Sequence, residues 1–138
     1  MKAVEYFNSG FSCSESIIKW AMDEGYVNPS SELLSVATSF SGGMSSGCLC
    51  GAIAGSQMVR GYLFGRENKK GNEVIARNLA KEFVEKFTEK YKVTCCRALT
   101  KGLIGGTPER KAHCSNMVEE CSKLLEQIIL EHSVAKEV

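Results

Sequence analysis

The stretch GNEVIARNLAKEFVEKFTEKY, residues 71–91, decides the fold class of this 138-residue chain. Its apolar residues recur every four positions, at Ile75, Leu79, Phe83, Phe87 and Tyr91. Most residues between them are Lys, Glu, Arg or Asn, and an apolar stripe on an otherwise charged segment is typical of an amphipathic helix that packs on a core. The stretch therefore predicts a helix over Gly71–Tyr91.

Helical patterns also fill the sequence on both sides of this stretch. A second apolar stripe, running from Cys114 to Ile129, predicts a helix over Glu109–His132. Apolar spacing together with capping serines and glycines predicts further helices, which cover Cys13–Glu24, Glu32–Phe40 and Gly47–Phe64, with a short helical turn at Cys95–Thr100. No alternating strand pattern occurs. The sequence predicts an all-α fold, a single domain over residues 1–138 built as a bundle of four to six helices.

Composition and charge exclude several classes of function. The formal net charge is +1, so nothing favours a nucleic-acid partner. The longest mainly apolar run, Cys48–Tyr62, is interrupted by Gln57 and Arg60, and the N-terminal residues form no apolar signal segment. We therefore expect no membrane span and a cytoplasmic location.

The most informative residues of such a chain are its cysteines. There are seven, Cys13, Cys48, Cys50, Cys95, Cys96, Cys114 and Cys121. Structural disulfides are disfavoured in a reducing compartment, and an odd number excludes complete internal pairing. Each cysteine is therefore a metal ligand, a reactive thiol or a small buried apolar residue.

Several cysteines precede or begin predicted helices. Cys13, Cys50 and Cys114 lie near such starts, where the helix dipole stabilises a thiolate and lowers its pKa. Cys48 and Cys50 differ by about 200° around a helix, so only one of them can face a site, and Cys50 is the better candidate. Cys121 lies on the apolar stripe of the last helix and is predicted to be core.

Glycines mark one face of the predicted helix that follows. Gly47, Gly51 and Gly55 recur every fourth residue, although a glycine inside a helix costs about 1 kcal/mol relative to alanine. Such a stripe indicates that something large approaches this face. It is either a neighbouring helix backbone or a cofactor, and in the second case Gly51 and Gly55 are candidate cofactor-binding residues.

Common catalytic and metal-binding signatures are missing. No CxxC occurs, which removes the usual sign of a zinc ribbon or a thioredoxin-like site. His113 adjoins Cys114 and is a candidate ligand or proton partner, whereas His132 reads as a solvated helix end. No hydrolase triad or nucleotide-binding loop is present, so no catalytic residue is predicted and enzymatic activity stays open.

The spaced motifs resemble those of the redox-active protein family labelled C_GCAxxG_C_C over nearly the whole chain. The matching segments are Tyr6–Cys13, Gly42–Met44, Cys50–Gly55, Cys96–Leu99 and Cys114. The label orders its central letters Gly-Cys-Ala, whereas this chain reads Cys50-Gly51-Ala52. The resemblance implies a helical fold and a redox or metal role for Cys13, Cys50, Cys96 and Cys114, with Cys95 as the alternative to Cys96.

Three functions follow from these residues. In the first, Cys13, Cys50, Cys96 and Cys114 hold an iron–sulfur cluster for electron transfer, with zinc as another occupant, because soft thiolates select these metals. In the second, the protein is a metal-free thiol–disulfide redox protein that uses Cys50 with Cys96 or Cys114. In the third, it is a helical interaction module with inert cysteines. The first two imply a redox partner protein, and a homodimer is possible.

Overall fold

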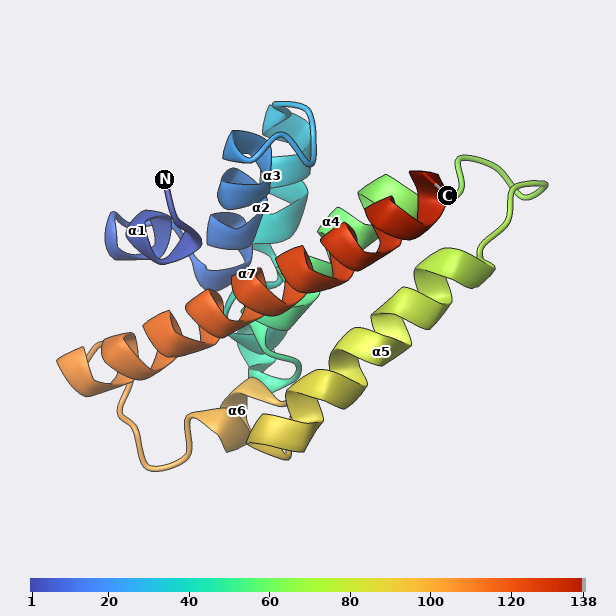
Figure 1. Cartoon of the computed structure of the whole chain (residues 1–138). Coiled ribbons are helices and arrows are strands. Elements are labelled where there is room, and N and C mark those ends of the chain that lie inside the picture. The colour runs from blue at the N-terminus through green and yellow to red at the C-terminus, as the bar shows by residue number, and fades with distance from the viewer. Residues whose placement is uncertain (138) are drawn as a thin grey trace.

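The computed structural model describes residues 1–137, with side chains up to His132, and its elements are helices throughout (Figure 1). They are α1 (Ala3–Asn8), α2 (Cys13–Asp23), α3 (Ser31–Thr38), the π-helical turn η1 (Gly43–Gly47), α4 (Gly51–Phe64), α5 (Val74–Tyr91), α6 (Cys96–Leu99) and α7 (Pro108–Glu137). No strand occurs among residues 1–137. The all-α prediction is confirmed.

Helix α7 organises the bundle, because it crosses the molecule and contacts α1, α2, α4 and α5 (Figure 1). Helix α2 packs on α4 and also against α1 and α3. The starts of α4 and α6 lie below the N-terminal half of α7 in this view. One core joins these helices, and its largest fully buried apolar side chains are Ile17, Ile18, Ile53, Val59, Leu79, Phe83, Phe87, Val118, Leu125 and Ile128.

Helix α5 buries a shorter stripe than its sequence predicts. It begins at Val74 instead of Gly71, and the prediction that Ile75 is buried is wrong, because 45% of this residue is exposed. The first turn of α5 follows the exposed 65–72 loop, so solvent reaches it. Phe83 is fully buried and lies under the guanidinium of Arg60, whose central carbon is 4.1 Å from the ring centre.

The glycine stripe of α4 has two members, because Gly47 lies in η1 with a φ of +77° and outside the helix. Gly51 and Gly55 face α2. A Cβ atom on Gly55 would lie 2.8 Å from the backbone oxygen of Ser14, and one on Gly51 would overlap the Sγ of Cys13. The group that approaches Gly51 and Gly55 is therefore the backbone of α2, together with the thiol of its first residue, Cys13. A cofactor contact at Gly51 and Gly55 stays a prediction.

The N-terminal helix α1 differs from the sequence prediction, which has no helix there. Its six residues are too few to show an apolar period. It is held by Lys111 of α7, whose Nζ donates to the backbone oxygen of Phe7 at 2.9 Å.

Within residues 1–137, no helix combines the length and the apolarity needed to cross a membrane.

Gly55 and Gly61 provide a test of the α2–α4 contact. Gly55→Ala should destabilise the protein, because the new Cβ meets the α2 backbone, whereas Gly61 has no atom within 4 Å of the same position. Gly61→Ala should stabilise the helix by about 0.5–1 kcal/mol. Urea unfolding followed by circular dichroism measures both. Equal effects at the two positions would contradict the proposed packing.

Phe83 and Ile75 test which part of the α5 stripe belongs to the core. Phe83→Ala should lower the free energy of unfolding by roughly 3–5 kcal/mol, because it leaves a cavity and removes the ring beneath Arg60. Ile75→Ala should cost less than about 1 kcal/mol, since its side chain is already partly in water. Chemical unfolding curves of the two variants give the comparison, and similar losses would place Ile75 in the core.

Candidate functional site

Cys13 is the first residue of α2, and the surrounding hydrogen bonds fix it there. The Ser12 hydroxyl accepts from the backbone N–H of Glu15 at 3.3 Å, while the Glu15 carboxylate accepts from the Ser12 N–H at 2.9 Å. This reciprocal pair is a capping box. Next to it, the buried Ser14 hydroxyl donates to the Ala37 carbonyl at 2.7 Å and joins this turn to α3. The Cys13 thiol is thereby held against α4.

Cys50 precedes α4 as its N-cap residue and is buried, with 7% of its surface exposed. Its backbone N–H donates to the Thr94 carbonyl at 2.8 Å. Thr94 lies two residues before Cys96, so this bond joins the segments that carry the two buried cysteines. Cys48, by contrast, is exposed. The helical rotation expected between Cys48 and Cys50 does not apply, because both residues precede α4 in non-helical conformations.

The segment between α3 and α4 has an unusual backbone. Gly42, Gly43, Met44 and Ser45 all have φ values between +54° and +64°, and the two non-glycine residues are held there at some conformational cost. A Cβ on Gly43 would lie 2.8 Å from the Cβ of Cys96. Only glycine allows this approach, and the left-handed turn therefore brings the backbone directly against the Cys96 side chain.

Cys96 begins α6 and is buried, whereas its neighbour Cys95 is the exposed N-cap. The Thr100 hydroxyl donates to the Cys96 carbonyl at 2.7 Å and closes the short helix. Arg97 donates to the Ser46 carbonyl at 2.9 Å, which ties α6 to η1. Of the adjacent pair, Cys96 is the residue that faces the interior.

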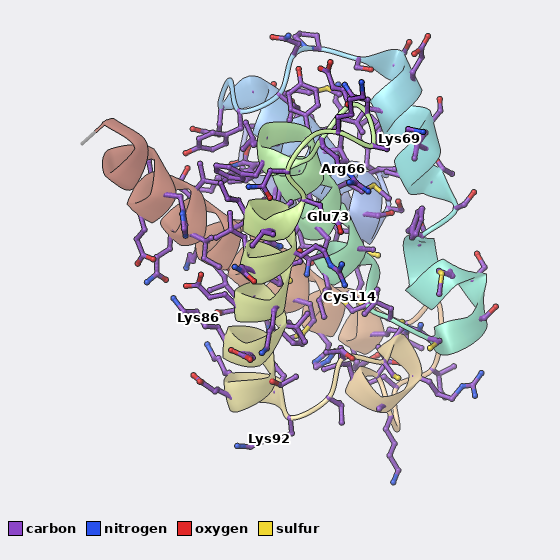
Figure 2. All side chains as sticks on the ribbon, turned by 90° about the vertical axis from the view of Figure 1, so that its right-hand side faces the viewer. Arg66, Lys69, Glu73, Lys86, Lys92 and Cys114 are labelled. Carbon is purple, nitrogen blue, oxygen red and sulfur yellow. The ribbon has the colours of Figure 1, made fainter. Side chains whose placement is uncertain are left out.

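Cys114 is half-buried and lies in the second turn of α7. It lies slightly farther from the helix start than the sequence predicts, because α7 begins at Pro108 instead of Glu109. In Figure 2 it lies near the middle of the molecule, with α5 on one side and η1 on the other. Arg110, one helical turn earlier, donates a hydrogen bond from its guanidinium to the Sγ of Cys96 at 4.0 Å, and it also lowers the pKa of the Cys114 thiol.

These four thiols influence one another electrostatically. A negative charge on Cys96 raises the pKa of Cys13, Cys50 and Cys114, and a charge on Cys13 raises the pKa of Cys50 and Cys114. Coulomb effects of this kind require proximity in a poorly solvated environment. Cys13, Cys50, Cys96 and Cys114 therefore share one neighbourhood, which we term the four-thiol site.

Burial has a stronger effect on these thiols than the helix ends do. It is the largest influence on Cys13, Cys50 and Cys114, and it raises the pKa of Cys50 to about 12. Backbone N–H groups of Gly42 and Ser14 lower the pKa of Cys13 without reversing this effect. The expectation of lowered pKa values at helix starts is therefore wrong for Cys13, Cys50 and Cys114, whose raised pKa values favour the neutral thiol.

Other candidate residues have different surroundings. Cys121 is fully buried in the core as predicted, yet charges on Cys50 and Cys13 raise its pKa, so it borders the site as well. The Nε2 of His113 is buried without a hydrogen-bond partner. Among the residues whose side chains are described, no group of three or more His, Cys, Asp and Glu is arranged to hold a metal ion.

Sequence reasoning missed Arg110, the arginine whose side chain approaches the Cys96 sulfur and influences Cys114. One signal was available, because Arg110 and Cys114 are separated by four residues on a predicted helix and such residues are neighbours on one face. Its proximity to Cys96 depends on the path of the 101–107 loop, which no spacing encodes.

Comparison with known proteins identifies one family. The model of the family described as "Putative redox-active protein (C_GCAxxG_C_C)" matches residues 11–128. This range includes all seven cysteines and every element from α2 to α6. No curated protein and no solved structure matches the chain.

The electrostatic effect of Arg110 can be measured at Cys114. Arg110→Gln should raise the pKa of the Cys114 thiol, because it removes a positively charged side chain that favours the thiolate. The pH midpoint of Cys114 alkylation, followed by mass spectrometry of its peptide, should move upward. Arg77→Gln, the same change on an exposed face of α5, should leave the midpoint unchanged. An unshifted midpoint in Arg110→Gln would contradict this assignment.

Proposed function

Because this chain belongs to the C_GCAxxG_C_C family of redox-active proteins, we propose that its working groups are the thiols of the four-thiol site. The placement of these thiols carries the proposal. The Cys13 sulfur lies against α4 next to Cys50, the Cys50 N–H binds the segment that carries Cys96, and Arg110 approaches Cys96 from the helix that carries Cys114. Cysteines that serve only as small core residues have no reason to gather from α2, α6, α7 and the cap of α4. All seven cysteines are free, which fits a protein kept in a reducing compartment.

In the first form of this proposal, the site works by thiol–disulfide exchange between Cys114 and Cys13. Cys114 is the attacking thiol, because it is only half-buried and Arg110 favours its thiolate. Cys13 is the second thiol, because it is the other half-buried member of the four and its charge raises the pKa of Cys114. The pairings of Cys50 expected from the sequence are less suited, because burial raises the pKa of Cys50 to about 12.

The exchange proceeds in two steps. The Cys114 thiolate attacks one sulfur of a disulfide oxidant, and the departing thiolate takes up the proton that Cys114 released. Cys13 then attacks the mixed disulfide, a second thiol leaves, and the protein holds a Cys13–Cys114 disulfide. Two electrons have passed from the protein to the oxidant, and a dithiol redox partner protein returns them.

An iron–sulfur cluster on Cys13, Cys50, Cys96 and Cys114 is the second candidate. The donor type suits it, and backbone N–H groups beside Cys13 and Cys50 are of the kind that tune cluster potentials. When bound, a cluster would supply one-electron transfer. The placement does not fit, because no three of the described thiols are arranged to hold a metal. The same argument applies to zinc.

Metal analysis and disulfide mapping separate the two candidates. Protein purified without oxygen should contain no stoichiometric iron, zinc or acid-labile sulfide. Oxidation should then remove two thiols and link the Cys13 and Cys114 peptides. Cys13→Ser should abolish that link, whereas Cys48→Ser, at an exposed thiol, should leave it intact. Iron and sulfide that disappear in Cys96→Ser would establish the cluster instead, and absence of both metal and link would refute a redox role.

A further inference from the structure

Two pockets lie on either side of Arg110, and each contains one thiol of the four-thiol site. The first, the Cys114 pocket, has a volume of about 420 Å³, and its lining includes Phe7, Thr107, Pro108, Arg110, Lys111 and Cys114. The second, the Cys96 pocket, has a volume of about 480 Å³, and its lining includes Cys96, Arg97, Thr100, Lys101 and Arg110. Volumes of this size are typical of sites for small molecules.

The charges that line these pockets are all positive. They come from Arg97, Lys101, Arg110 and Lys111, and no Asp or Glu lines either pocket. The whole chain, by contrast, has 17 Lys and Arg against 16 Asp and Glu. The excess of positive charge is therefore a local feature of the two pockets that contain Cys114 and Cys96.

Within the described residues, none of these four cations forms an ion pair with a carboxylate. Arg97 donates to a backbone carbonyl, and so does Lys111, whose Nζ also lies 3.6 Å from the centre of the Phe7 ring. Such contacts hold the side chains in place but leave their charge uncompensated. A partly enclosed group of unneutralised cations attracts anions.

We propose that these pockets bind an anionic disulfide, a small molecule whose disulfide is flanked by carboxylates. The inference rests on the proposed thiol–disulfide exchange and names the substrate class of that site. The planar guanidinium of Arg110 can bind one carboxylate through two parallel hydrogen bonds, and Lys111 or Lys101 can attract the other. The substrate disulfide then lies beside the Cys114 thiol, which lines the same pocket.

The reaction balances without any further component. Cys114 and Cys13 lose two electrons and two protons and form one disulfide. The substrate gains both and is released as two anionic thiols, each carrying one carboxylate. The same cations that attract the dianionic substrate then hold each monoanionic product less strongly, which favours release.

A series of three disulfides tests the charge preference on the wild-type protein. Reduced protein is mixed with 3,3′-dithiodipropionate, bis(2-hydroxyethyl) disulfide or cystamine, which are dianionic, neutral and dicationic. Formation of the internal disulfide is followed by mass spectrometry, and each rate is divided by that of free cysteine with the same compound. The normalised rate should be at least tenfold higher for the dianion than for the dication, and high salt should reduce this ratio.

Charge-removing variants locate the preference. Lys101→Gln and Lys111→Gln should each reduce the ratio roughly three- to tenfold. Lys69→Gln should not, because Lys69 lies in the 65–73 loop, well away from Cys114 (Figure 2). Reaction with all three disulfides at equal normalised rates would overturn the anion site and leave thiol exchange standing. Failure to react with any of them would refute the proposed exchange, and this inference with it.

Discussion

The absence of a side chain at Gly51 is the constraint on which the site depends. Helices α2 and α4 approach until the Cys13 sulfur touches the backbone next to Cys50, and a Cβ at that point would overlap the sulfur. The Cys50 N–H then binds the Thr94 carbonyl and draws in the segment that carries Cys96. Three thiols thus come together through contacts that involve the backbone.

The site combines two electrostatic environments. On one side, burial keeps Cys50 and Cys13 neutral despite the N–H groups directed at them. On the other, the positive charge of Arg110 partly offsets the effect of burial on the pKa of Cys114, which lines a pocket. Two thiols kept neutral by burial and one thiol beside a cation are therefore neighbours in one site.

The sequence predicts the helices that are long and periodic. Helices α5 and α7 follow from their apolar spacing, whereas α1 is shorter than two turns and has no detectable period. The start of α4 could not be predicted, because Met44 and Ser45 adopt left-handed conformations that nothing in their residue type requires. The four cysteines were found from helix starts and a family resemblance. Arg110 was not found, because its proximity to Cys96 depends on how the loop after α6 places the start of α7 beside that helix.

The four-thiol site is assembled from residues 13 to 114, across nearly the full length of the fold. Contacts between residues so distant in sequence form late in folding. While the chain is being synthesised, six combinations of these four sulfurs are available for oxidation, and no helix packing yet selects among them. The thiol–disulfide exchange proposed above therefore requires that the chain fold before its cysteines are oxidised.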